Sequence, residues 1–154
     1  MVYLRNILVT TDLSEYSLAA MEHAATFSLL YAAKLHLLYV TDVDAKEFQR
    51  VGEAAARNAL QEFVAKHVNP DTRLIPVVRR GTPADEIIKF AEEEGMDLVV
   101  VATHGRTGLK HMVMGSVAER IVRRSTIPVL TVKPHPMRES ILMNEDVEHE
   151  LHLR

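Results

Sequence analysis

The chain has 154 residues, of which 47% are hydrophobic and 25% are charged, and this balance is typical of a single globular domain with a sizeable core. The net charge of −3 at pH 7 argues against sequence-independent binding of nucleic acid, which requires a basic surface. The sequence contains no cysteine, which excludes disulfides, zinc–thiolate sites and cysteine nucleophiles.

Membrane and export signals are not evident in the sequence. No apolar run approaches the ~20 residues needed to cross a bilayer. The amino-terminal segment MVYLRNILVTTD runs into a strand-like stretch without the layout of a signal peptide. We therefore expect a cytoplasmic protein with no membrane partner.

Apolar runs and helical patterns alternate along the chain. Residues 6–10 (NILVT) form a β-branched run that predicts the first strand. Residues 14–33 predict the first helix, and residues 35–40 the second strand. One face of the predicted helix carries apolar residues at three- and four-residue spacing: Leu18, Met21, Ala25, Leu29 and Ala32.

The middle of the chain continues the alternation. Residues 44–68 predict a second helix, and residues 73–78 a third strand. The predicted buried stripe of this helix consists of Phe48, Val51, Ala55, Ala59 and Phe63. Pro76 cannot donate a hydrogen bond to a neighbouring strand, so the third strand is expected at an edge of the sheet. Pro83 is expected in the first turn of a third helix, and Gly95 at its end.

The last predicted elements are a strand at residues 97–103, a helix at 115–125 and a strand at 127–133. Short, continuously apolar strands that alternate with helices are typical of parallel sheets covered on both faces. We therefore predict an α/β fold with an open, doubly wound, five-stranded parallel sheet and helices on both faces. Residues 1–134 are expected to form this domain, and residues 135–154 a carboxy-terminal appendage.

Ligands of open parallel sheets bind at the carboxyl ends of the strands, where the strand order changes direction. Three loops at such ends carry unusual residues: 10–14 (TTDLS), 39–42 (YVTD) and the glycine-rich stretch after the fourth strand, 102–120 (ATHGRTGLKHMVMGSVAER). These loops predict where the site lies.

The glycine-rich stretch has features of a phosphate cradle. Ser116 and Glu119 have the S-x-x-E spacing of a capping box, and a helix N-terminus offers unpaired N–H groups and a partial positive charge. Gly115 has no Cβ, so an anion could approach the backbone there. Gly105 and Gly108 are expected to let the loop fold over the anion with its N–H groups inward.

Cationic side chains in the same loop, Arg106, Lys110 and His111, could add positive charge around a phosphate. The alternative is that Gly105 and Gly108 are ordinary turn residues in front of an ordinary cap. The spacing matches neither the Walker A motif nor G-x-G-x-x-G. Phosphate binding and a plain turn therefore both remain open on the residues alone.

Other strand-end residues also have two interpretations. The carboxylate of Asp12 could accept hydrogen bonds from ribose hydroxyls, or it could cap the first helix in a D-x-x-E pattern with Glu15. The backbone of Val40 could pair with an adenine edge. His104 and Asp12 are the only nearby candidates for a catalytic base, and His104 could instead bond a backbone carbonyl. We expect a binding module rather than an efficient enzyme.

Taken together, these segments resemble the universal stress protein family, in particular its nucleotide-binding branch. That branch carries G-x-x-G, nine residues and then G-[S/T] after the fourth strand. Here nine residues, 106–114, separate Gly105 from Gly115 and Ser116. Further matches in NILVTTDLSEYS, GTPADEII, DLVVVATHGRTGL and STIPVLTVK extend the resemblance over residues 3–133.

The resemblance implies a Rossmann-like fold of the adenine nucleotide alpha hydrolase-like type and an ATP site, with Mg²⁺ or Mn²⁺ accompanying the phosphates. Asp12 would face the ribose and adenine, and the backbone of Val40 would meet the adenine. The first glycine of the family motif corresponds to Ala102, whose methyl group is harmless in strand geometry. The candidate site consists of Thr10, Thr11, Asp12, Val40, Ala102, His104, Gly105, Arg106, Gly108, Gly115, Ser116 and Val117.

The resemblance also implies a homodimer that pairs through the last strand, at residues 128–132. The pairing residues would be Val129, Leu130, Thr131 and Val132. The expected function is that of a nucleotide-responsive regulatory module in the stress response, with at most slow ATP hydrolysis or autophosphorylation. The alternative is a dimer of the same fold that acts through partner proteins and binds no nucleotide, since the family also has a branch without ATP binding.

Overall fold

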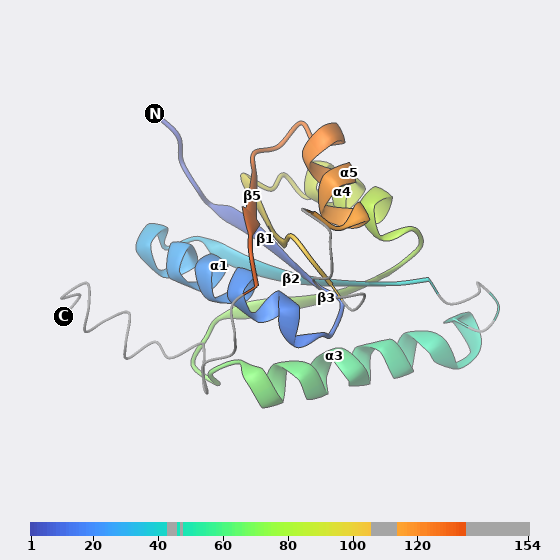
Figure 1. Cartoon of the computed structure of the whole chain (residues 1–154). Coiled ribbons are helices and arrows are strands. Elements are labelled where there is room, and N and C mark those ends of the chain that lie inside the picture. Colours follow the sequence, from blue (N-terminus) through green and yellow to red (C-terminus); the bar gives the residue numbers. More distant parts are fainter. Residues whose placement is uncertain (43–45, 47, 106–113, 135–154) are drawn as a thin grey trace.

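The computed structural model describes residues 1–42, 46, 48–105 and 114–134 of the chain (Figure 1). The predicted appendage, 135–154, lies outside the described residues, so the division of the chain at residue 134 stays a prediction. Arg106, Gly108, Lys110 and His111 also lie outside them.

Within the described residues, five parallel strands form one sheet in the order β3-β2-β1-β4-β5. The strands are β1 (Asn6–Thr11), β2 (Lys34–Thr41), β3 (Leu74–Arg80), β4 (Leu98–Ala102) and β5 (Val129–Val132). The predicted open parallel sheet is confirmed. β3 is an edge strand, as Pro76 predicted, and the strand order reverses direction between β1 and β4.

Helices cover both faces of this sheet, with α1 and α3 on one face and α4 and α5 on the other (Figure 1). The α-helices are α1 (Leu18–Tyr31), α3 (Glu53–His67), α4 (Pro83–Glu93) and α5 (Ser116–Arg124). A 3-10 turn, η1 (Glu15–Ser17), precedes α1, and a π-helical turn, η2 (Phe48–Gly52), precedes α3. Pro83 is the first residue of α4, and Gly95 follows its end with φ 62°, so both predicted boundaries of this helix are confirmed.

The central strand explains why the apolar runs are continuous. Ile7 and Val9 of β1 pack in the core under α1 and α3, whereas Leu8 packs in the core under α4 and α5. All three side chains are at most 1% exposed. Because successive side chains of a strand point to opposite faces, the middle of a strand covered on both faces is apolar at every position, as residues 7–9 of β1 are.

The predicted buried stripe of the second helix is confirmed at Phe63 and wrong at Ala55 and Ala59. In α3 the buried side chains are Ala56, Leu60 and Phe63, whereas Ala55 is exposed and Ala59 is only partly buried. Alanine is compatible with either face, so the larger Leu60 and Phe63 decide the rotation of the helix. The side chains of the other two predicted members, Phe48 and Val51, lie outside the described ones.

The first helix also differs from its prediction. It begins at Leu18, after the η1 turn, rather than at residue 14. Leu29 is 40% exposed, and Ala32 lies beyond the last turn with φ 51°. The buried face lies near the start of the helix and consists of Leu18, Ala19, Ala20, Met21 and Ala24. In the described part of the chain, no helix has the length and apolar character needed to cross a membrane.

Candidate functional site

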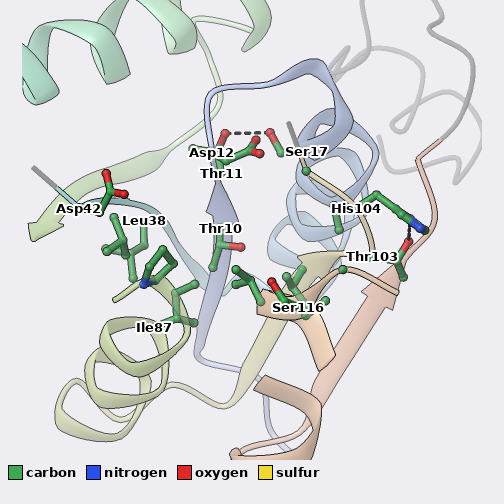
Figure 2. Close-up of a pocket in the computed structure, with 18 residues that line it drawn as sticks. Thr10, Thr11, Asp12, Ser17, Leu38, Asp42, Ile87, Thr103, His104 and Ser116 are labelled. Carbon is green, nitrogen blue, oxygen red and sulfur yellow. Dashed lines mark hydrogen bonds between the residues drawn. The ribbon is translucent and has the colours of Figure 1, made fainter. Parts of the chain in front are cut away.

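A cavity of about 430 Å³ opens at the carboxyl ends of β1, β2 and β4 (Figure 2). It lies at the point where the strand order reverses, where the sequence predicted a ligand site. The predicted residues that line it are Thr10, Thr11, Asp12, Val40, Ala102, His104, Gly105, Gly115, Ser116 and Val117. The two remaining candidates, Arg106 and Gly108, lie outside the described residues.

The cavity is also lined by residues that were not predicted. They are Ser17, Leu38, Asp42, Pro83, Ile87, Val101, Thr103 and Ala118. Leu38, Val101 and Ile87 could not be told from other core residues by their pattern in the sequence. The three loops at strand ends did include Asp42 and Thr103, so their positions were available from the sequence although their roles were not.

One end of the cavity is apolar and the other is polar. Leu38 and Ile87 lie at one end, with Asp42 beside Leu38, and Ser116 lies toward the other end at the start of α5 (Figure 2). Thr10 lies between them. The apolar end suits a flat ring, and the helix N-terminus suits an anion.

The backbone of Val40 borders the cavity where a strand ladder ends. The carbonyl of Thr41 accepts a hydrogen bond from the N–H of Gly81 (2.9 Å), so Thr41 faces β3. Backbone groups of successive strand residues point to opposite sides, so the carbonyl of Val40 faces β1. The paired part of β2 ends at Tyr39, which lies opposite Thr11 of β1. The carbonyl of Val40, the next residue of β2, therefore lies beyond the end of β1.

Asp12 contacts two loops. Its Oδ1 atom accepts hydrogen bonds from the backbone N–H (3.0 Å) and the hydroxyl of Ser14. Its Oδ2 atom lies against Gly105 so closely that a Cβ there would overlap it. The residue before η1 is Ser14, and the residue before α1 is Ser17, so Asp12 does not hold the cap position that the D-x-x-E pattern predicted.

The hydroxyl of Thr11 is used within its own loop. It accepts a hydrogen bond from the N–H of Leu13 (2.9 Å) and lies 2.8 Å from the hydroxyl of Ser17 (Figure 2). Since the Ser17 hydroxyl donates to the carbonyl of Ser14 (2.8 Å), Thr11 must donate to Ser17. Thr11 therefore has no hydroxyl hydrogen left for a ligand.

Gly115 is needed for a close approach to the chain itself. Its N–H donates to the carbonyl of Thr103, and a Cβ at Gly115 would meet that same oxygen at 3.0 Å. Gly115 has φ −70° and ψ 157°, an extended conformation open to any residue, and the described glycines with left-handed φ are Gly81 and Gly95. The contact with Thr103 is thus one reason for glycine at this position, and the expectation that Gly115 clears a path for an anion stays a prediction.

The predicted capping box is also corrected. Gly115 is the cap residue of α5 and has no side chain that could make a capping hydrogen bond, and Ser116 is the first residue of the helix. Glu119 instead forms an ion pair with Arg123 (2.5 Å). The first-turn N–H groups of α5 are therefore not covered by the Ser116 side chain at the edge of the cavity.

Thr103 and His104 close the polar end. Nδ1 of His104 lies 2.8 Å from the hydroxyl of Thr103, and His104 is 8% exposed (Figure 2). The N–H of Thr103 donates to the carbonyl of Val132 (2.9 Å). Ala102 is the last residue of β4 and pairs with Val132, so its strand geometry is confirmed.

The charged side chains among the described lining residues are Asp12 and Asp42. Across residues 1–42, 46, 48–105 and 114–134, no group of three or more histidine or acidic side chains could hold a metal ion. The positive potential at the described part of the site therefore comes from backbone N–H groups, chiefly those at the start of α5.

Comparison with known proteins gives the family. The model of the universal stress protein family matches residues 4–133. Universal stress protein MJ0577 of Methanocaldococcus jannaschii is 30% identical over 158 residues, which cover 86% of this chain and 96% of that protein. Universal stress protein MJ0531 of the same organism is 32% identical over 143 residues, which cover 84% of this chain and 82% of that protein.

Solved structures agree with this assignment. The structure of MJ0577 is similar with a TM-score of 0.66 at 31% identity, covering 88% of this chain and 100% of that chain. A universal stress protein solved in complex with cAMP is similar with a TM-score of 0.61 at 27% identity, covering 84% of this chain and 97% of that chain. The chain therefore belongs to the universal stress protein family.

Proposed function

We propose that this chain binds an adenine nucleotide, ATP accompanied by Mg²⁺ or Mn²⁺, and acts as a nucleotide-responsive module in the stress response. The observation that carries the proposal is the polarity of the cavity, which is apolar at Leu38 and Ile87 and ends at the N-terminus of α5, where the cap residue is a glycine. A base, a sugar and a phosphate chain have the same order of polarity. The relative solved with cAMP supports an adenine nucleotide as the ligand class.

The proposed placement follows from the polar groups along the cavity. The adenine ring lies at the apolar end, where its exocyclic amine donates to the carbonyl of Val40. The ribose hydroxyls donate to Asp12, which lines the cavity. The phosphates accept hydrogen bonds from the backbone N–H groups of Gly105, Ser116 and Val117, at the positive end of the α5 dipole.

The proposal includes at most slow ATP hydrolysis. A hydrolase needs a base placed on the attacking water. Nδ1 of His104 is bonded to the Thr103 hydroxyl, and one oxygen of Asp12 is bonded to Ser14, so both candidates already serve the protein structure. Binding rather than turnover is the activity that these contacts favour.

The proposal also includes a homodimer through β5. This strand is at the edge of the sheet, and its residues Val129, Leu130 and Thr131 are only partly buried in the single chain. Pairing with the same strand of a second copy would satisfy the outer backbone groups and cover these side chains. A cytoplasmic location stays a prediction.

Substitution of Ser116 by aspartate tests the placement of the phosphates. Ser116 is the first residue of α5, where a negative charge stabilises the helix by about 0.3–1 kcal/mol through its dipole. The same charge would repel a phosphate. We expect Ser116→Asp to fold with unchanged or higher stability and to bind ATP with Mg²⁺ at least about tenfold more weakly in titration calorimetry.

The matched control is Ser116→Asn, which is polar and of similar size but neutral, and which should lose much less affinity. Equal ATP binding by Ser116→Asp and wild type would show that the phosphates do not lie at the start of α5.

The purified wild-type protein should also release adenine nucleotide on denaturation, detected by anion exchange. Protein that is empty and does not bind added ATP with Mg²⁺ would favour the nucleotide-free dimer.

A further inference from the structure

The carboxylate of Asp12 is held by the short segment that follows it. Its Oδ1 atom accepts two hydrogen bonds from Ser14, one from the backbone N–H (3.0 Å) and one from the hydroxyl. Its Oδ2 atom lies against Gly105. The two oxygens therefore have different neighbours, and rotation of the Asp12 side chain would break the contacts of both.

The segment has a strained backbone that hydrogen bonds maintain. Leu13 has φ 65°, in the left-handed region that disfavours residues other than glycine. The N–H of Leu13 donates to Thr11 (2.9 Å), and the carbonyl of Ser14 accepts from the hydroxyl of Ser17 (2.8 Å). Both sides of the strained residue are thus fixed, and Ser14 lies back over Asp12 as a result.

We propose that Ser14 is the positioning residue for Asp12. Its hydroxyl fixes Oδ1, so that the carboxylate already has one orientation before a nucleotide enters the cavity. A group fixed in advance loses less conformational freedom on binding, which raises affinity. Ser14 is not among the described residues that line the cavity, so it acts through Asp12. The inference rests on the proposed function, in which Asp12 accepts hydrogen bonds from the ribose.

The test is a double-mutant cycle on the full chain, with ATP and Mg²⁺ in titration calorimetry. Ser14→Ala removes one charge-assisted hydrogen bond and should weaken binding about five- to tenfold. Ser14→Thr retains the hydroxyl and should return affinity to within about twofold of wild type. In the Asp12→Ala background, Ser14→Ala should have no further effect, because the group that it orients is gone.

The matched control is Ser125→Ala. The Ser125 hydroxyl also makes local bonds, with the carbonyl (2.8 Å) and the N–H (3.1 Å) of Ile127, but it lies after the far end of α5. This variant should bind as wild type does. Wild-type affinity in Ser14→Ala, or an equal loss in the wild-type and Asp12→Ala backgrounds, would overturn the proposal in favour of a purely structural Ser14.

A second measurement needs no nucleotide and separates this proposal from the proposed function. The carboxyl ¹³C resonance of Asp12 should shift in Ser14→Ala and stay unchanged in Ser125→Ala. An unchanged resonance in Ser14→Ala would overturn the positioning role. A shifted resonance in a protein that binds no ATP would keep Ser14 as the positioning residue and would remove only the nucleotide.

Discussion

At position 105 the side chain of Asp12 occupies the space that a methyl group would need. Gly105→Ala should therefore displace the Asp12 carboxylate, with a loss of stability of about 1–3 kcal/mol, as for other overpacked sites. Removal of the carboxylate should relieve the overlap, so Gly105→Ala should cost much less in the Asp12→Ala background. Urea unfolding of the four proteins measures both costs.

The residue to compare with Gly105 is Gly115. A Cβ there meets a backbone oxygen, that of Thr103, rather than a side chain. The cost of Gly115→Ala should therefore be the same with and without Asp12→Ala. If the cost of Gly105→Ala is also independent of Asp12, the close contact of Asp12 with Gly105 is not what the methyl group disturbs.

Single residues show what the sequence could and could not predict about the site. Ala102 was placed correctly because an unbroken apolar run determines strand geometry. Thr11 was expected to line the site and does, but its hydroxyl serves Ser17, six residues later. One reason for glycine at position 115 is a contact with Thr103, twelve positions away, across a loop. Such contacts depend on tertiary structure and leave no pattern in the sequence.

At the level of elements, the contact of β2 with α4 contains a histidine whose charge opposes folding. His36 lies edge-on to the ring of Phe90, with 6.1 Å between the ring centroids. Burial lowers the pKa of His36 from 6.5, and this effect exceeds the opposing influence of the Ile7 backbone and of Glu94, while Lys34 adds to the lowering. The guanidinium of Arg79, on β3, lies over the same Phe90 ring at 5.4 Å.

The lowered pKa predicts weaker folding in mild acid. As the pH falls below 6.5, the unfolded chain takes up a proton at His36 before the folded chain does, so the free energy of unfolding decreases. His36→Leu cannot take up this proton, and its stability should decline less steeply between about pH 7 and about pH 5. Urea unfolding across this range, on wild type and variant, measures the two slopes.

His67 is the control for this experiment, because burial lowers its pKa too, and because its ring lies 4.8 Å from that of Phe63 in α3. His67→Leu should remove a separate part of the acid sensitivity, and the two parts should add in the double variant, since the residues lie on different elements. If the free energy of unfolding declines with equal slopes against pH in wild type and His36→Leu, folding does not lower the pKa of His36.

The elements themselves were largely predictable, and their rotations were not. Strand and helix alternation gave the parallel sheet, and Pro76 alone placed β3 at an edge. Which side of α3 is buried depended on Leu60 and Phe63, because the alanines around them fit either side. Small residues carry little information about burial, so a stripe of alanines does not determine which side of the helix faces the core.

At the level of the whole molecule, charge constrains which nucleotide the cavity can hold without help. The chain carries a net charge of −3, and the charged side chains among the described lining residues are Asp12 and Asp42. A triphosphate brings several further negative charges into the same cavity, whereas a monophosphate brings fewer. The backbone N–H groups at the start of α5 supply only about half of one positive charge.

This balance predicts that a divalent cation matters more for ATP than for AMP. A cation bound to the phosphates neutralises part of their charge. Adding Mg²⁺ in place of a chelator should therefore tighten ATP binding about tenfold or more and change AMP binding less than about twofold. Titration calorimetry with each nucleotide, at one ionic strength, gives the four affinities.

Asp42→Asn provides the internal check, because it removes one negative charge from the cavity wall and nearly preserves the shape of the side chain. It should tighten ATP binding in the chelator about two- to fourfold, since an exposed charge is partly screened by solvent and salt. Its effect should be smaller once Mg²⁺ is present. If ATP binds equally well with and without Mg²⁺, the charge of the phosphates does not limit affinity, and the metal has no role in binding.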